Sequence, residues 1–397
     1  MKESAALNRL ARISESASIA IADRVRSMEA SGKRVIRLQT GDPDFATPQE
    51  VINAASAALK RGATHYSLSR GLFELRQAIA EKLLKENGLD YDPQEEVLVT
   101  HGGVHAVFIS ISALVSSGDE VLILDPSWMP YAAATTLAGA APVRIASSAG
   151  SEFRPQIEQI RKSISPKTRM LIINTPCNPT GIVLQPEELA ELAEIAICQD
   201  LIVLADEVYE KIVFEPSAHI SIATLKGMRE RTITVNSFSK SYAMTGWRIG
   251  YLAGPVSLVS QILKVSQYTI TNLAPFVQIA ALHALTSESC REHTEQMRSA
   301  YQMRRQIAFQ AFAKTQKVKS IMPAGTFYLM LDVSRIDSSS ERVADELLEK
   351  KMVATVPGIT YGTCAEGFLR LSLTVSEEDL KNALTRITDF AISAGGA

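Results

Sequence analysis

Residues 170–210 read MLIINTPCNPTGIVLQPEELAELAEIAICQDLIVLADEVYE, and their pattern indicates the fold class. Two short runs, MLIIN (170–174) and LIVLAD (201–206), are continuously apolar, as strands buried on both faces are. Residues 185–200 lie between them with helical spacing, and Pro186 suits the first turn of a helix. A strand, a helix and a second strand in this order predict two parallel strands joined by a crossover helix.

The same alternation continues on both sides of this stretch. Three more apolar runs are expected to be strands: VLVT (97–100), VLILD (121–125) and TITVN (232–236). The five runs, with helical patterns between them, predict an α/β fold with a mostly parallel sheet.

The two ends of the chain have other patterns. Residues 47–62 carry the signals of a helix, with Thr47 as its cap, Glu50 completing a capping box and Gly62 at its end. After about residue 290 the pattern changes to helix and then to short strands at residues 325–333 and 367–375. This change predicts a smaller α+β domain, which about the first 40 residues are expected to join.

Composition and charge exclude several classes of protein. The chain has 397 residues, more than one typical core supports, so two domains are expected. The formal net charge is −2, so the chain as a whole has no excess positive charge that would attract nucleic acid or an anionic membrane. No apolar run approaches the roughly 20 residues of a membrane span. The four cysteines include no C-x-x-C pair, which argues against a metal site or disulfides and favours the cytoplasm.

The N-terminal segment, residues 1–27, contains serine and arginine as a transit peptide does. It also contains Glu3, Glu15 and Asp23, and it lacks a secretory apolar core. We interpret it as a first helix that packs on the body of the protein.

Residues with ligand-binding chemistry follow the predicted strands. Ligands of an open α/β sheet bind beyond the carboxyl ends of its strands, so these residues are expected to converge on one crevice. They are Gly103, Trp128, Asn178, Asp206, Ser237 and Lys240. Together they suit a ligand with a phosphate, a flat ring, a basic ring nitrogen and an electrophilic carbon, and pyridoxal phosphate has all four. No G-x-G-x-x-G follows a first strand, which disfavours a nicotinamide dehydrogenase.

The segment SFSKSYAMTGWRIG (237–250) resembles the cofactor-attachment site of the class I aminotransferases, which are pyridoxal-phosphate enzymes of fold type I. Further matching motifs follow the family's order from RLQTGDPDFATP (37–48) to FLRLSLTV (368–375). The chain is most similar to the prokaryotic aspartate/aromatic aminotransferase branch, and the resemblance covers nearly its whole length.

The resemblance implies the architecture and the assembly. A large cofactor-binding domain, residues 48–290, would hold a mostly parallel seven-stranded sheet. A small α+β domain would combine residues 1–47 with residues 291–397. The family habit also implies a homodimer with shared active sites.

The resemblance assigns roles around the cofactor ring. Lys240 resembles the lysine that forms a Schiff base with the cofactor, and Arg248 is expected to help lower the pKa of this amine. Asp206 resembles the carboxylate that pairs with the protonated ring nitrogen and keeps the ring an electron sink. Asn178 and Tyr209 resemble the residues that bond the phenolic oxygen of the ring.

Other positions resemble the family's phosphate and substrate contacts. The phosphate ligands would be Ser237, Ser239, Arg248 and the backbone N–H groups of Gly103 and Val104. Trp128 resembles an aromatic residue that stacks on the ring, and Tyr66 resembles a tyrosine that reaches the phosphate of the partner subunit. Arg370 resembles the arginine that binds the substrate α-carboxylate, over which the backbone of Gly41 closes. The substrate site would thus contain Gly41, Trp128, Asn178 and Arg370.

These roles predict a transaminase that moves an amino group from an amino acid to a 2-oxo acid with ping-pong kinetics. Lys240, Asp206 and Tyr209 would be its catalytic residues. A C–S β-lyase, or another enzyme that breaks a bond at Cα, shares the cofactor contacts and is the alternative. A transcription regulator built on this fold would need an added DNA-binding domain, for which the sequence leaves no room.

The sequence leaves the amino acid substrate open. Relatives that bind dicarboxylates need a second cation, and in one branch it is a lysine on the helix after the glycine turn. Here Val104 stands where such relatives often have lysine, and the rest of that helix has no lysine or arginine. Aspartate, aromatic and neutral amino acids therefore all stay possible, with a second cation from the N-terminal segment or the partner subunit. His101 and His105 lie near the predicted phosphate turn and are assigned no role.

Overall fold

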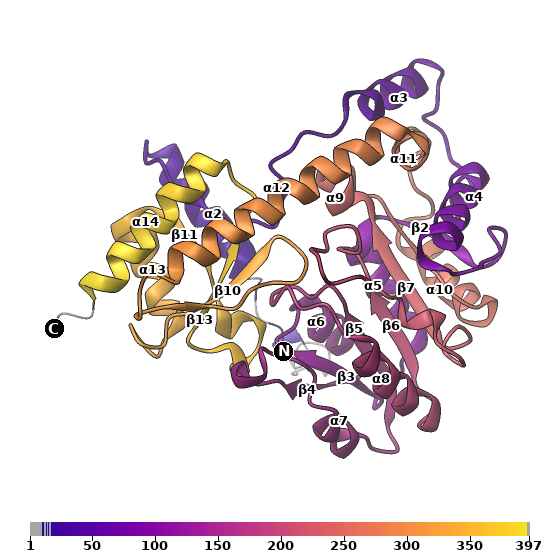
Figure 1. The fold of residues 1–397 in the computed structure, drawn as a ribbon. Helices are drawn as coiled ribbons and strands as arrows, with labels where there is room; N and C mark the ends of the chain where they lie inside the picture. Colours follow the sequence, from indigo (N-terminus) through magenta and orange to yellow (C-terminus); the bar gives the residue numbers. More distant parts are fainter. Residues whose placement is uncertain (1–9, 12, 14, 16, 395–397) are drawn as a thin grey trace, which may run out of the picture.

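The structure of the chain is a computed structural model that describes residues 10, 11, 13, 15 and 17–394. Its centre is a seven-stranded sheet in the order β2-β8-β7-β6-β5-β3-β4 (Figure 1). Strand β8 is antiparallel to β2 and β7, and the other neighbouring pairs are parallel. The strands are β2 (Val97–Thr100), β3 (Glu120–Asp125), β4 (Ala141–Ala146), β5 (Thr168–Asn174), β6 (Ile202–Asp206), β7 (Thr232–Ser237) and β8 (Gly250–Ala253). The predicted α/β fold with a mostly parallel sheet is confirmed.

Helices cover both faces of this sheet, which is why its central strands are apolar without alternation. Ile172 and Leu204 pack with helices α5, α6 and α10 on one face. Their neighbours Leu171 and Val203 pack with helices α7 and α8 on the other. The helices named are α5 (Gly102–Leu114), α6 (Pro130–Leu137), α7 (Ile157–Ser163), α8 (Pro186–Cys198) and α10 (Val256–Thr269). The central strands β5 and β6 therefore pass through the middle of a layered core.

Three further helices pack together beside the β2 edge of the sheet (Figure 1). They are α3 (Gln49–Lys60), α4 (Phe73–Lys82), which continues into a π-helical turn (Leu83–Asn87), and α11 (Pro275–Thr286). Helix α8 begins with Pro186 in its first turn, as predicted, and the structure adds a capping box between Gln185 and Glu188.

The capping box predicted for residues 47–62 is wrong. Helix α3 has Pro48 at its N-cap and no side-chain cap. The hydroxyl of Thr47 instead donates to the carbonyl oxygen of Ala243 at 2.6 Å. The Glu50 carboxylate accepts hydrogen bonds from Ser287 and Ser289. Tertiary partners have therefore replaced the local cap, and they connect α3 to distant segments.

A second, antiparallel sheet lies beside the first, in the order β12-β13-β10-β9. Its strands are β9 (Lys319–Ser320), β10 (Tyr328–Asp332), β12 (Val356–Pro357) and β13 (Phe368–Ser372). Helices α12 (Glu288–Phe312), α13 (Ser340–Lys351) and α14 (Glu377–Ser393) contribute to its core. The strands predicted within residues 325–333 and 367–375 are thus present. Domain boundaries near residues 48 and 290 stay a prediction.

The N-terminal segment joins this smaller sheet region. Strand β1 (Ile36–Arg37) pairs in parallel with β11 (Val353–Ala354). Helix α2 (Ala17–Ala30) buries Val25 against Leu348, which agrees with a first helix that packs on the body. Most of the preceding residues lie outside the described part of the chain.

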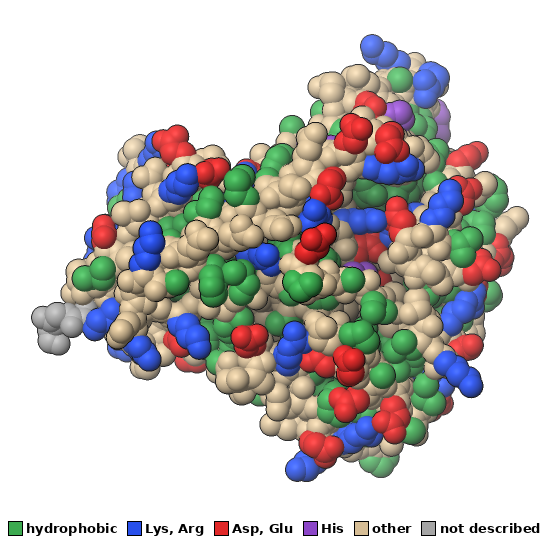
Figure 2. Space-filling view, in the orientation of Figure 1, with side chains coloured by type: hydrophobic (Ala, Val, Ile, Leu, Met, Phe, Trp, Pro, Cys, Tyr) green, Lys and Arg blue, Asp and Glu red, His purple; other side chains and the backbone are tan. Residues whose placement is uncertain are grey.

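The surface in Figure 2 carries acidic and basic side chains interspersed, with no broad patch of one sign. Within residues 17–394, no helix combines the length and apolar character needed to cross a bilayer. All four cysteines are free thiols. The cytoplasmic location inferred from them stays a prediction.

Candidate active site

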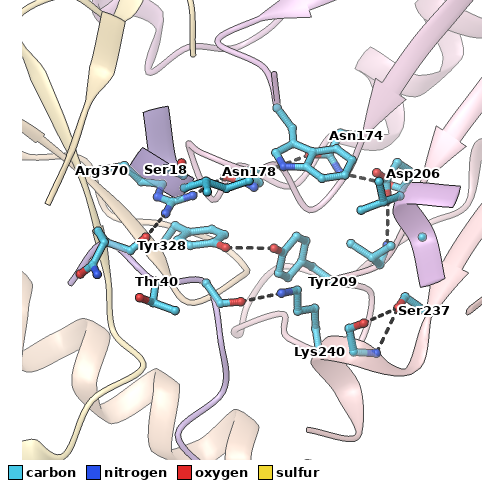
Figure 3. A pocket seen from close by; sticks show the side chains of 18 of the residues that line it. Ser18, Thr40, Asn174, Asn178, Asp206, Tyr209, Ser237, Lys240, Tyr328 and Arg370 are labelled. Atoms are coloured by element: carbon cyan, nitrogen blue, oxygen red, sulfur yellow. Dashed lines mark hydrogen bonds between the residues drawn. The ribbon is translucent and has the colours of Figure 1, made fainter. Parts of the chain in front are cut away.

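A pocket of about 330 Å³ lies between the two sheets, at the carboxyl ends of β5, β6 and β7 (Figure 3). Such a volume suits a small organic ligand. All but one of the predicted site residues line it: Gly41, Gly103, Val104, Trp128, Asn178, Asp206, Tyr209, Ser237, Ser239, Lys240, Arg248 and Arg370. Residues from both sheets and from helix α2 thus meet around a single cavity.

Lys240 is on the short helix α9 (Phe238–Ser241), which follows strand β7 directly. Its Nζ reaches across the pocket and donates to the carbonyl oxygen of Gly41 at 2.5 Å (Figure 3). Burial lowers the pKa of the Lys240 amine, and Arg370 and Arg248 lower it further, against the opposing effects of Tyr328 and Asp42. Arg248 therefore acts in the predicted direction, but desolvation is the main cause.

An anion cradle lies beside this lysine. The Ser237 Oγ accepts a hydrogen bond from the backbone N–H of Ser239 at 3.1 Å, and both serines are buried. Helix α5 points its N-terminus into the same region, with Gly102 and Gly103 as its first residues. Gly102 has a φ of +80°, which favours glycine, and a Cβ there would lie 2.8 Å from Nη2 of Arg248. Hydroxyls, a helix N-terminus and an arginine make a set that suits a phosphate.

Asp206 ends strand β6 at the base of the pocket and is only 3% exposed. Its Oδ2 accepts a hydrogen bond from the Tyr131 hydroxyl at 2.6 Å, and its Oδ1 accepts one from the backbone N–H of Val208 at 3.3 Å. Burial raises the pKa of the Asp206 carboxyl to about 6, although the Tyr131 hydrogen bond lowers it. A carboxylate in this position suits a protonated nitrogen.

Asn174 fixes the loop that carries Asn178. The side-chain amide of Asn174 donates to the Asp206 carbonyl at 2.9 Å, and its Oδ1 accepts the backbone N–H of Asn178 at 2.8 Å. Two neighbouring strand ends are thereby held in a fixed relation at the edge of the pocket.

Two buried tyrosines meet opposite Asn178. The hydroxyls of Tyr209 and Tyr328 are 3.2 Å apart and hydrogen-bonded (Figure 3). Burial raises the pKa of Tyr209 well above its ordinary value, so its hydroxyl keeps its proton. A Cβ at Gly41 would lie 1.9 Å from the Tyr328 hydroxyl, which explains the glycine at that position.

Arg370, on strand β13, is buried where the two sheets face each other. One Nη donates to the Asn178 Oδ1 at 3.2 Å and the other to the Gln39 carbonyl at 2.6 Å. The guanidinium carbon lies 4.1 Å from the ring centroid of Tyr328 and 5.2 Å from that of Tyr361. Within the described part of the chain its Nε has no hydrogen-bond partner. A rigid, buried guanidinium with a spare donor suits a carboxylate ligand.

A buried ionic network lies behind the end of β6. Glu207 accepts hydrogen bonds from Ser221 and His219, and Glu210 pairs with Lys82. The two carboxylates and the imidazole are close enough together to hold a metal ion. The Lys82 ammonium already occupies a place beside Glu210, whereas the buried Nδ1 of His219 has no hydrogen-bond partner among the described residues.

One predicted site residue, Tyr66, and the two histidines that were assigned no role lie apart from this centre. Tyr66 is 88% exposed and does not line the pocket. His101 and His105 hydrogen-bond through the His101 backbone N–H, and His105 also contacts Thr269. Neither histidine lines the pocket.

Sequence reasoning missed several residues of the pocket. Asn174 ends a predicted strand, so the strand-end signal could have found it. Tyr131 and Tyr328 do not end a predicted strand. The fold brings Tyr131 to Asp206 and Tyr328 to Tyr209. Helix α2 adds a stripe of lining residues: Ser18, Ile19, Ala22 and Arg26.

Known proteins with similar sequences and structures have related activities. The family model described as "Aminotransferase class I and II" matches residues 33–387. An aspartate aminotransferase of Pyrococcus abyssi is 41% identical, over 90% of this chain and 92% of that protein. Aromatic-amino-acid aminotransferase 2 of Thermococcus litoralis is 39% identical, over 89% of this chain and 90% of that protein. The solved structure of Thermus thermophilus aspartate aminotransferase with maleate is similar with a TM-score of 0.93 and 37% identity, over 98% of this chain and 100% of that chain.

Proposed function

Because this chain belongs to the class I and II aminotransferase family and is an aminotransferase, we propose that its pocket holds pyridoxal 5′-phosphate on Lys240. The enzyme would then move the amino group of an L-amino acid to a 2-oxo acid. The observation that carries this proposal is the placement of Lys240 between a phosphate-type cradle and a buried arginine, in a pocket that the carboxylate of Asp206 also lines.

The residues present fit this cofactor. Ser237, Ser239, Arg248 and the N-terminus of α5 would hold its phosphate, and Asp206 would hold its ring nitrogen. Asn178 and Tyr209 would bond the ring oxygen, while Trp128 would cover one face of the ring. The close approach of the Arg248 guanidinium to Gly102, in the first turn of α5, supports this assignment.

Once bound, the cofactor supplies an electrophilic carbon and an electron sink for the Cα–H bond of the substrate. Arg370 binds the α-carboxylate of the amino acid and fixes the direction of that bond. The Nζ of Lys240, released from the cofactor when the substrate amine takes its place, would be the base that accepts and carries the Cα proton. The lowered pKa of Lys240 favours the neutral amine that this step needs.

Cofactor uptake tests this proposal directly. The purified protein would be saturated with pyridoxal phosphate, treated with borohydride and digested for mass spectrometry. We expect one stoichiometric label, on the peptide that contains Lys240. No uptake, or a label spread over surface lysines, would contradict the proposed site.

The pocket lining also supports a proposal about the substrate. Val104 and Ile19 line the pocket beside Trp128, so the lining available to a side chain is largely apolar. Arg26 is the one further cation among the described lining residues, and it pairs with Asp23 at 3.1 Å. We infer that aromatic and other apolar amino acids are better substrates than aspartate.

Replacing Val104 with lysine is expected to shift this preference. A charge-assisted hydrogen bond should raise kcat/KM for aspartate relative to phenylalanine by about tenfold or more. Steady-state kinetics with both amino acids measures the ratio. Arg26→Gln is the matched test of the other cation. A strong selective loss on aspartate in that variant would show that Arg26 supplies the acid-binding charge and would contradict the apolar preference.

We also propose that the enzyme is a homodimer in which Tyr66 reaches the phosphate cradle of the partner subunit. Tyr66, Leu68 and Tyr268 are 88%, 61% and 94% exposed, which is unusual for large apolar side chains. The segments that carry them are connected by a hydrogen bond from Gln267 to Ser69. Analytical ultracentrifugation should find a dimer, and a fully active monomer would contradict the shared site.

A further inference from the structure

Tyr131 is a buried tyrosine that the proposed cofactor contacts do not include. It lies in the first turn of helix α6, three residues after Trp128, and is 1% exposed. Its ring packs edge-on against Trp128, with centroids 5.4 Å apart and an interplanar angle of 79°. Its hydroxyl donates to the Asp206 carboxylate at 2.6 Å. One side chain therefore contacts both the aromatic cover of the pocket and its buried carboxylate.

The surroundings of Asp206 oppose its ionisation. The side chain is removed from water, the neighbouring Glu207 carboxylate repels it, and Lys240 is its attractive cation. Besides Tyr131, the carboxylate accepts only the longer hydrogen bond from Val208 among the described residues. Tyr131 therefore makes the shortest contact that favours the charged form.

Tyr131 is a permanent donor in this contact. Burial raises the pKa of its hydroxyl well above the ordinary value, and the nearby Asp206 charge raises it further. Its proton therefore stays on the phenol oxygen and points to Asp206 Oδ2. Packing against Trp128 and the helix α6 backbone restricts the direction of this donation.

We propose that Tyr131 is a positioning residue that keeps the Asp206 carboxylate charged and directed at the ring nitrogen of the cofactor, and so sets the strength of that pairing. This inference rests on the proposed function, because it requires pyridoxal phosphate in the pocket. It gives Tyr131 a task distinct from its packing against Trp128, because the effect of its hydrogen bond is transmitted through Asp206 and the ring nitrogen.

The test compares Tyr131→Phe with the unchanged protein in binding two probes to the cofactor-free enzyme. One probe is pyridoxal phosphate, and the other is its analogue with C–H in place of the ring nitrogen. Loss of a hydrogen bond to a charged group should weaken pyridoxal phosphate binding about tenfold. The analogue cannot pair with Asp206, so its affinity should not change. The matched control is Tyr301→Phe, a buried tyrosine whose hydroxyl has no partner among the described residues.

The outcomes separate the possible roles of Tyr131. Equal weakening of both probes would mean that Tyr131 only packs, and unchanged binding of both would mean that its hydrogen bond is unimportant; either result overturns the inference. If the unchanged protein binds neither probe, the proposed function itself fails.

A second variant tests the same hydrogen bond in case Tyr131→Phe does not fold. Tyr131→difluorotyrosine keeps the hydroxyl and makes it a stronger donor. It should bind pyridoxal phosphate more tightly than the unchanged protein does, with no change for the analogue. Equal or weaker binding of pyridoxal phosphate by this variant would contradict the inference.

Discussion

Replacing Lys240 with alanine is expected to lower kcat by about 10⁴-fold or more, the upper end of what one general base contributes. The loss should be this large because Lys240 both anchors the cofactor and moves the Cα proton. Its Nζ projects into the centre of the pocket, where it contacts Gly41. Single-turnover kinetics of the variant saturated with pyridoxal phosphate measures the loss, and the visible absorbance of the covalent linkage should disappear with it.

The matched control is Lys264→Ala. Lys264 is exposed on helix α10, where it contacts Gln261. This variant should keep both activity and absorbance. If Lys240→Ala retained more than about a hundredth of the activity, a different residue would have to be the base and the proposed site would be wrong.

Replacing Asp206 with asparagine is expected to lower kcat/KM by about 10²- to 10⁴-fold, because removing one partner of a buried charge pair costs about 3–5 kcal/mol. The amide keeps the shape of the side chain but cannot balance a protonated ring nitrogen. Asp200→Asn is the control, since Asp200 is a surface carboxylate in an ion pair with Arg231. Equal kinetics of Asp206→Asn and the unchanged enzyme would contradict the assigned role.

The same substitution has a pH signature. Burial raises the pKa of Asp206 to about 6, so the free protein protonates this carboxyl as the pH falls through 6. The neutral acid cannot pair with the ring nitrogen. Cofactor affinity of the unchanged protein should therefore weaken below about pH 6, and the acid limb due to Asp206 should be absent in Asp206→Asn.

The central strands could be predicted from the sequence because burial on both faces leaves no room for polar residues. Segments such as MLIIN and LIVLAD are apolar throughout, and strands β5 and β6 lie within them. The convergence of Asn178, Asp206 and Lys240 followed from the same reasoning, since parallel strands bring their carboxyl ends to one edge.

Other features depend on tertiary contacts that no local pattern reveals. Strand β4 is an edge strand with only Ile145 fully buried, and β8 runs antiparallel within an otherwise parallel order. Thr47 and Glu50 fit a capping box by spacing, yet Ala243 and the start of α12 supply better partners. Tyr131 reaches Asp206 only because α6 packs on the face of the sheet where β6 ends.

The most direct test of the central claim is the visible absorbance of the cofactor-loaded enzyme during titration with one L-amino acid and no oxo acid. Transamination predicts that the yellow colour bleaches with one oxo acid formed per active site and returns when a 2-oxo acid is added. An enzyme that keeps its colour while it continuously releases ammonia and pyruvate would contradict transamination and establish β-elimination instead.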